Sequence, residues 1–152
     1  MSTITAQSEQ VYSVFIRAMP EQVWDGITKP EFTAKYFYGT VIESSFEPGT
    51  SYVSRSVDGG PAMIEGEILE ADPPRLLRQS WRSAWDPDQA SEPASRVTWQ
   101  IEAQEDGTTK LTVTHDQLES SPKTAESVSG GWSYIVSGLK TLLETGEPLA
   151  SG

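Results

Sequence analysis

The sequence has 152 residues with 22 acidic and 11 basic side chains, which gives a formal net charge of −11, and it contains no cysteine. This length suits one domain, and the strong negative charge argues against binding to nucleic acids or to anionic membrane surfaces. Without cysteine, the chain has no disulfides, no thiolate nucleophile and no zinc site built from thiolates.

The two ends of the chain are polar. The first ten residues combine neither a basic start nor an apolar run, so a signal peptide is not expected. No apolar stretch approaches the roughly 20 residues that span a bilayer. We therefore expect a cytoplasmic protein without a membrane partner, with flexible tails at 1–9 and 147–152.

Most of the chain before residue 120 has strand character. Branched and aromatic residues predict a first strand at 11–16, followed by two short helices, one opened by Met19-Pro20-Glu21 and ended by Pro30, the other over 31–36. Alternation of apolar and polar residues predicts further strands at 40–42, 51–57, 62–71, 76–82, 97–101 and 111–115. The stretch 85–94, which contains two prolines, is expected to be a loop.

The last apolar stretch, 131–146, predicts a long helix. Its apolar residues recur with helical spacing on one face: Trp132, Ile135, Val136, Leu139, Leu142 and Leu143. Ser121-Pro122 is typical of a helix start, with the serine as N-cap, and Gly146 of a left-handed stop. Gly130-Gly131 fits either a hinge or a site of close backbone packing.

Strands at hairpin spacing and segregated helices predict an α+β fold. We expect a curved antiparallel sheet of about six to seven strands that grips one long C-terminal helix, with two short helices after the first strand, as a single domain over 10–146. Large rings and polar interior residues such as Gln79 and His115 fill a concave sheet imperfectly, so we also expect a cavity between sheet and helix. That cavity requires Trp81, Trp99 and Trp132 to leave a void between them.

The chain over 10–146 resembles the START-like, helix-grip superfamily, and within it the homologues of the activator of the heat-shock-protein-90 ATPase. The resemblance is carried by AMPEQVW at 18–24, GEILEADPPRLL at 66–77 followed by Ser80-Trp81, GTTKLTVTH at 107–115, and Gly131-Trp132 with Leu142-Leu143-Glu144. It implies a hydrophobic pocket between the concave sheet and the C-terminal helix. Superfamily members use such pockets for lipids, hormones and polyketides, and a minority turn over their ligand.

The candidate ligand-binding residues are those expected to face this cavity: Phe32, Tyr36, Ile64, Gln79, Trp81, Trp99, His115, Trp132, Ile135 and Val136. His115 is the only histidine, so a cluster of histidines around a metal is excluded. The histidine is either hydrogen-bonded within the pocket wall or a general base that titrates near neutrality. Asp116 follows it directly and points to the other face of the strand, so it does not orient the ring.

Two pairs of charged residues, Glu65 with Glu67 and Arg78 with Arg82, are expected on the outer face as solvated or cross-strand ion pairs. No phosphate-binding glycine loop occurs, and we expect no cofactor and no metal.

Three functions remain open. The first is binding of a small hydrophobic or aromatic ligand in the cavity. The second is an enzyme of the polyketide cyclase, aromatase or hydrolase kind with His115 as base, ranked lower because no catalytic cluster is visible. The third is a co-chaperone-like protein-interaction module. A homodimer formed through an exposed strand edge also stays open.

Overall fold

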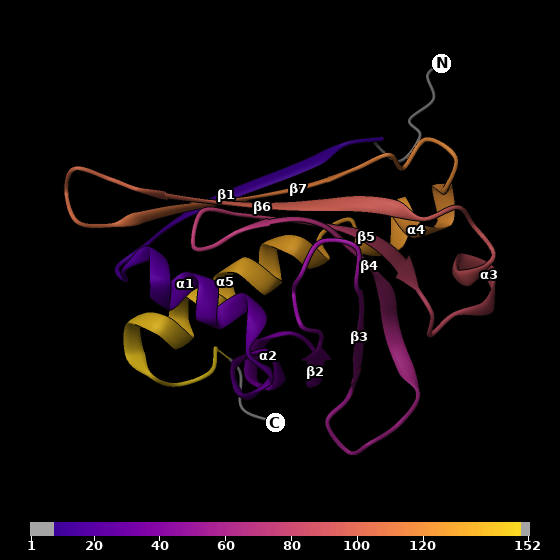
Figure 1. Cartoon of the computed structure of the whole chain (residues 1–152), viewed down its shortest axis with the longest axis horizontal. Helices are drawn as coiled ribbons and strands as arrows, with labels where there is room; N and C mark the ends of the chain where they lie inside the picture. The colour runs from indigo at the N-terminus through magenta and orange to yellow at the C-terminus, as the bar shows by residue number, and fades with distance from the viewer. Residues whose placement is uncertain (1–7, 150–152) are drawn as a thin grey trace.

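A computed structural model describes residues 8–149, so most of the two expected tails lies outside the described residues. Seven antiparallel strands form one sheet in the order β1-β7-β6-β5-β4-β3-β2 (Figure 1). The strands are β1 (Gln10–Ile16), β2 (Thr40–Glu43), β3 (Ser51–Ser56), β4 (Ala62–Asp72), β5 (Leu76–Ser83), β6 (Ser95–Ala103) and β7 (Thr109–Asp116). All seven predicted strands are therefore confirmed, with ends that differ by at most two residues.

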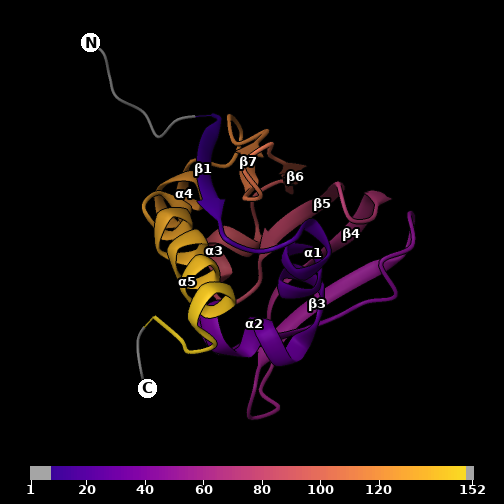
Figure 2. The same ribbon diagram turned by 90° about the vertical axis from the view of Figure 1, so that its left-hand side faces the viewer.

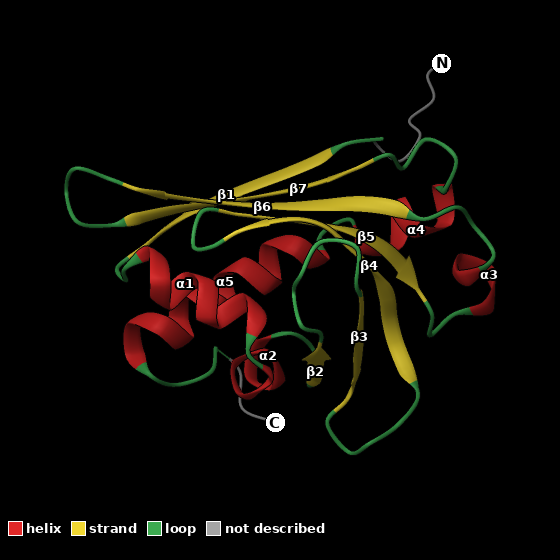
Figure 3. Ribbon diagram, viewed as in Figure 1, coloured by secondary structure: helices red, strands yellow, loops and turns green. Residues whose placement is uncertain are grey.

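Five helices accompany this sheet within the described residues. They are α1 (Pro20–Thr28), α2 (Pro30–Tyr36), α3 (Pro87–Ala90), α4 (Pro122–Val128) and α5 (Gly131–Thr145). Figure 2 shows the sheet curving around α1, α2 and α5, and Figure 3 shows these helices together on one side of the strands. The predicted α+β fold, a curved sheet that grips the C-terminal helix, is confirmed.

Alternation along the strands separates the core from the outer face. In β7 the side chains of Leu111, Val113 and His115 are buried, while the residues between them are partly exposed. The same alternation holds Leu77, Gln79 and Trp81 of β5 inward. The inward faces meet the buried apolar face of α5, whose members are Trp132, Ile135, Val136, Leu139 and Leu142. The apolar periodicity thus predicts the core correctly.

The outer face of the sheet carries the expected cross-strand ion pairs. Arg82 pairs with Glu65, and Arg78 Nη1 lies 2.7 Å from Glu70 Oε1. These side chains are partly exposed, so each pair adds little to stability. The carboxylates of Glu65 and Glu70 in β4 therefore form ion pairs at the surface and take no part in an interior site.

Two local expectations differ from the structure. The stretch 85–94 contains the short helix α3, with the Asp86 side chain as its N-cap. The C-terminal helical segment is two helices, because Gly130 takes a left-handed φ of 83° between α4 and α5. Gly146 ends α5 in the left-handed conformation, as predicted.

The N-terminus of helix α4 is capped by a side chain that is distant in the sequence. Ser121 occupies the N-cap position, but its hydroxyl donates to Pro93 O at 2.7 Å and caps nothing. The carboxylate of Glu92 instead accepts from Lys123 N at 3.0 Å and from Thr124 N at 2.8 Å. Although burial acts in the opposite direction, these hydrogen bonds lower the pKa of Glu92 below its usual value. The predicted helix start is therefore confirmed, with Ser121 at the N-cap position and Pro122 as the first helical residue, but the capping hydrogen bonds come from the Glu92 carboxylate and not from the serine hydroxyl.

Replacing Glu92 by alanine should lower the free energy of unfolding at neutral pH by about 1 kcal/mol, the usual cost of losing an N-cap. Because the folded-state pKa of Glu92 is lowered, the stabilisation exists above the ordinary glutamate pKa and disappears as the pH falls through the folded value. The difference between wild type and variant should therefore shrink in acid. Urea unfolding at pH 7 and pH 3 measures it, together with amide exchange of Lys123 and Thr124. Glu119→Ala, an exposed carboxylate just before α4, is the control, and equal loss in both variants would contradict the cap.

None of the helices within residues 8–149 is both long enough and apolar enough to cross a membrane.

Candidate functional site

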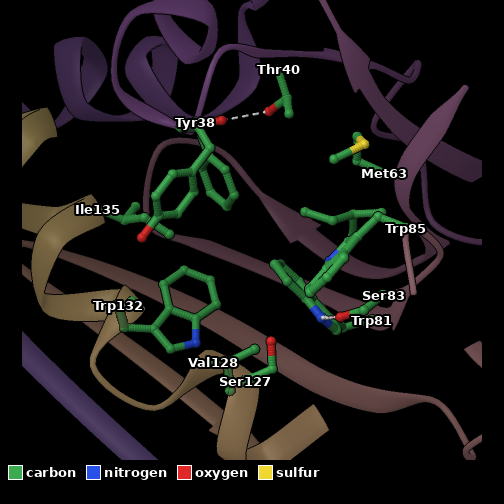
Figure 4. Close-up of a pocket in the computed structure, with 13 residues that line it drawn as sticks. Tyr38, Thr40, Met63, Trp81, Ser83, Trp85, Ser127, Val128, Trp132 and Ile135 are labelled. Atoms are coloured by element: carbon green, nitrogen blue, oxygen red, sulfur yellow. Dashed lines mark hydrogen bonds between the residues drawn. The ribbon is translucent and has the colours of Figure 1, made fainter. Parts of the chain in front are cut away.

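A pocket of about 290 Å³ opens at one end of the groove between the sheet and α5 (Figure 4). It lies where the α2–β2 turn, strands β4 and β5 and the α4–α5 junction meet. Its lining residues are Phe37, Tyr38, Thr40, Met63, Ile64, Trp81, Ser83, Trp85, Ser127, Val128, Gly131, Trp132 and Ile135. Figure 4 shows Tyr38 and Trp85 on opposite sides of the hollow, with Trp81 and Trp132 at its base in this view.

The chemistry of the lining is apolar and aromatic. Five of its residues carry rings, and among the lining residues, all within the described part of the chain, none is charged. Besides the phenol of Tyr38, three aliphatic hydroxyl groups interrupt the apolar wall: those of Thr40, Ser83 and Ser127. Thr40 Oγ1 already donates to Phe37 O at 2.7 Å. Ser83 Oγ accepts from Trp81 Nε1 at 3.1 Å, a bond that leaves the serine proton free for another acceptor.

A tryptophan cluster determines where the pocket lies. The Trp132 ring centre is 5.4 Å from that of Trp81 and 5.5 Å from that of Trp99, both in tilted or edge contacts. These rings fill the middle of the hollow, and only a void of about 20 Å³ remains beside Trp99. That void is about the size of one water molecule. The cavity expected under the helix is therefore largely closed in the middle, and open space remains at the α4–α5 end.

His115 helps to hold this tryptophan cluster in place through hydrogen bonds. Trp132 Nε1 donates to His115 Nδ1 at 3.0 Å, so the ring proton is on Nε2, which donates to Ser95 Oγ at 2.7 Å. Ser95 Oγ in turn donates to Trp81 O at 3.4 Å. Burial lowers the pKa of His115 to about 3, and Asp116 opposes this shift only in part. The histidine is thus a neutral positioning residue behind the pocket wall, and the expectation of a base that titrates near neutrality is wrong.

The predicted site residues separate into three groups. Ile64, Trp81, Trp132 and Ile135 line the pocket. Gln79 and Trp99 line the small void, where Trp99 Nε1 donates to Gln79 Oε1 at 3.1 Å. His115 lies behind Trp81 and Trp132, in ring contact with both.

The third group lines neither space, and besides His115 it contains Phe32, Tyr36 and Val136. Tyr36 Oη donates to Gly26 O at 2.7 Å, and its Cβ lies 3.2 Å from the position that a Cβ on Gly138 would take. The tyrosine therefore joins α2 to α1 and α5.

Sequence reasoning missed the residues that form the mouth: Phe37, Tyr38, Met63, Trp85 and Val128. Tyr38 and Trp85 lie in turns, where side-chain direction follows no period. No sequence signal therefore marked them, and only the structure shows that Tyr38 and Trp85 are 62% and 50% exposed beside one hollow.

Within the described residues, no group of three or more histidine, aspartate and glutamate side chains could hold a metal ion.

A curved antiparallel sheet wrapped around a C-terminal helix, with an apolar pocket between them, defines the helix-grip class of START-like proteins. Residues 17–144 match the family described as "Activator of Hsp90 ATPase homolog 1-like protein". The chain therefore belongs to this family.

Solved structures support the same fold. DynU16 from the dynemicin biosynthetic locus superposes with a TM-score of 0.75 at 22% identity, covering 93% of this chain and 49% of that chain. The HSP90 activator PFC0360w of Plasmodium falciparum gives a TM-score of 0.73 at 20% identity over 90% of this chain and 96% of that chain. The Aha1 dimer of Colwellia psychrerythraea gives 0.72 at 16% identity over 92% and 98%. At these identities the likeness establishes the fold alone. No curated protein matches the sequence.

Proposed function

We propose that the protein binds a small, uncharged, flat hydrophobic molecule in the pocket at the α4–α5 junction. The observation that carries the proposal is an open hollow of about 290 Å³ walled by aromatic rings. Such apolar hollows with a few polar groups are the usual form of small-molecule sites. Ring faces such as those of Trp81 and Trp132 favour ligands that are themselves flat and aromatic.

Charge narrows the class of ligand. An ion that enters an apolar pocket loses its hydration and finds no opposite charge among the lining residues that the structure describes. The formal net charge of −11 adds repulsion for anions in particular. A carbonyl or hydroxyl oxygen on the ligand is compatible with the free proton of Ser83, which would orient it.

The two alternative functions have less support. An enzyme that uses His115 as base would need a free Nδ1 or Nε2, and both nitrogens are hydrogen-bonded in a fully buried side chain. An interaction module related to co-chaperones would act through the surface, and the family description together with the HSP90 activator of Plasmodium falciparum keeps it open. A homodimer stays a prediction, since the Colwellia structure is a dimer of another protein.

Two dyes of matched shape test the proposal. N-phenyl-1-naphthylamine is neutral, and 1-anilinonaphthalene-8-sulfonate has the same ring system with one added sulfonate. The neutral dye should bind with enhanced fluorescence on direct excitation, and the sulfonate should bind at least about tenfold more weakly. Equal binding of the two dyes, or none by the neutral one, would contradict the proposed pocket.

A pair of matched substitutions locates the binding. Val128→Trp places a large ring into the pocket wall and should weaken binding of the neutral dye at least about tenfold. Val57→Trp makes the same change at a valine that is 63% exposed in the β3–β4 turn, and should leave binding unchanged. If both variants bind equally well, the dye occupies a different site.

A further inference from the structure

Tyr38 combines a strained backbone with an exposed ring at the mouth of the pocket. Its φ is 53°, in the left-handed region that disfavours side chains, and the following Gly39 has a φ of 67°. The tyrosine side chain is 62% exposed, so the strain is not compensated by burial of the ring. Strained residues of this kind concentrate at functional sites.

Hydrogen bonds hold the backbone on both sides of Tyr38. Thr40 N and Thr40 Oγ1 both donate to Phe37 O, at 3.1 Å and 2.7 Å, and Val57 N donates to Gly39 O at 2.9 Å. The backbone of the turn is thus held in place by the start of β2 and the end of β3. A side chain on a fastened turn moves by rotation about its own bonds and leaves the fold unchanged.

The ring of Tyr38 crosses to the helix on the other side of the mouth. It stacks on the Tyr134 ring, with centres 5.7 Å apart and planes 21° from parallel. Its hydroxyl lies 3.4 Å from the position that a Cβ on Gly131 would take, at the first residue of α5. Tyr134 is itself 44% exposed, so the stack lies at the surface and not in the core. Tyr38 therefore connects the α2–β2 turn to α5 across one side of the pocket (Figure 4).

We propose that Tyr38 is the gate of the pocket, open when its ring stacks on Tyr134, as in this structure, and closed when the ring leaves Tyr134 and turns over the hollow. The proposal rests on the proposed ligand-binding function. The turn keeps a tyrosine where glycine would fit better, and this tyrosine lines one side of the entrance. Ligand exchange is then limited by the return of the Tyr38 ring to Tyr134.

The test uses the exchange rate of N-phenyl-1-naphthylamine. Tyr38→Gly should raise its dissociation rate at least about tenfold without lowering the midpoint of urea unfolding, because glycine suits the left-handed turn. Tyr38→Phe keeps the ring and should keep the slow rate. Gln117→Gly is the matched control, since exposed Gln117 also has a positive φ of 60° and lines no part of the pocket. Unchanged dissociation in Tyr38→Gly would overturn the gate.

A second readout needs no ligand. The chain lacks cysteine, so Ser83→Cys places a single thiol on the buried pocket wall. Its alkylation by N-ethylmaleimide should be at least about fivefold faster when Tyr38→Gly is added, and unchanged when Gln117→Gly is added. Faster alkylation without any dye binding would contradict the proposed function but still support the gate. Dye binding with unchanged alkylation and an unchanged dye dissociation rate would contradict the gate but still support the proposed function.

Discussion

The free energy of unfolding should fall as the pH drops from about 6.5 to 5, and the substitution His115→Gln should remove most of this fall. In the unfolded chain the histidine takes up a proton near its ordinary pKa of about 6.5. In the folded protein, burial lowers the pKa of His115 to about 3. Between these values the unfolded state binds one more proton, so stability decreases as the pH falls. The slope from this one group approaches about 1.4 kcal/mol per pH unit.

Glutamine suits the comparison because it is always neutral and offers both an acceptor and a donor, as the histidine ring does for Trp132 and Ser95. Urea unfolding at pH 7, 6, 5 and 4 on both proteins measures the difference. Glu92 and Glu144 also have lowered pKa values, but they titrate at lower pH and do so in both proteins. A difference in unfolding free energy between the two proteins from pH 6.5 to 5 therefore comes from the protonation of His115. Parallel curves for the two proteins there would mean that the folded histidine takes up its proton normally.

The substitution His115→Leu distinguishes the effect of protonating His115 from the effect of losing its hydrogen bonds. Leucine is also neutral, but it leaves the Trp132 N–H without its acceptor in a buried place. That loss should cost roughly 1–3 kcal/mol at pH 7, where the glutamine variant stays closer to wild type. If the two variants are equally stable at pH 7, the Trp132 hydrogen bond carries no weight in the fold.

The strands and the inward face of the sheet were predictable because they follow from local alternation. The inward positions of Val97, Trp99, Val113 and His115 come directly from a period of two residues. The same rule placed Gln79 and Trp81 on the concave side. Periodicity states which face a side chain occupies, and in regular strands that answer depends on nothing distant.

The break between α4 and α5 needed information from elsewhere in the chain. Gly130-Gly131 was compatible with either a hinge or close packing. The separate start of α4 is held by Glu92, about thirty residues earlier, and the serine that would cap it by local rules bonds to Pro93 instead. A capping side chain that comes from another loop leaves no spacing signal.

The position of the pocket was not predictable for a related reason. Trp81, Trp99 and Trp132 face inward as expected, yet whether three rings meet or leave a void depends on distances of less than the width of a ring. The mouth is built by Tyr38 and Trp85, whose directions are set by turn geometry. The family resemblance indicated a pocket between sheet and helix, and only the packing places it at the α4–α5 end.

Gly66→Ala should be the most damaging small substitution in the sheet, with a loss of about 3 kcal/mol or more in the free energy of unfolding. A Cβ at this position would clash with Ser80 O and lie 2.8 Å from Tyr52 Cε1. Gly66 and Tyr52 are partners in the β3–β4 register, and Tyr52 Oη donates to Ser80 O at 2.6 Å. The tyrosine ring thus occupies the space that the glycine leaves free, and its hydroxyl binds the backbone of β5.

One methyl group would therefore force three strands apart at once. Relief requires either the Tyr52 ring to leave a buried place or the β5 backbone to move, and the latter would break the bond from Glu67 N to Ser80 Oγ at 2.8 Å. Gly60→Ala is the control, because its Cβ would lie no closer than 3.3 Å to its neighbours, the Asp58 and Ser56 side chains at the β3–β4 turn. Thermal and urea unfolding of both variants measures the contrast. A loss below about 1 kcal/mol in Gly66→Ala would show that Tyr52 does not hold β3, β4 and β5 in this register.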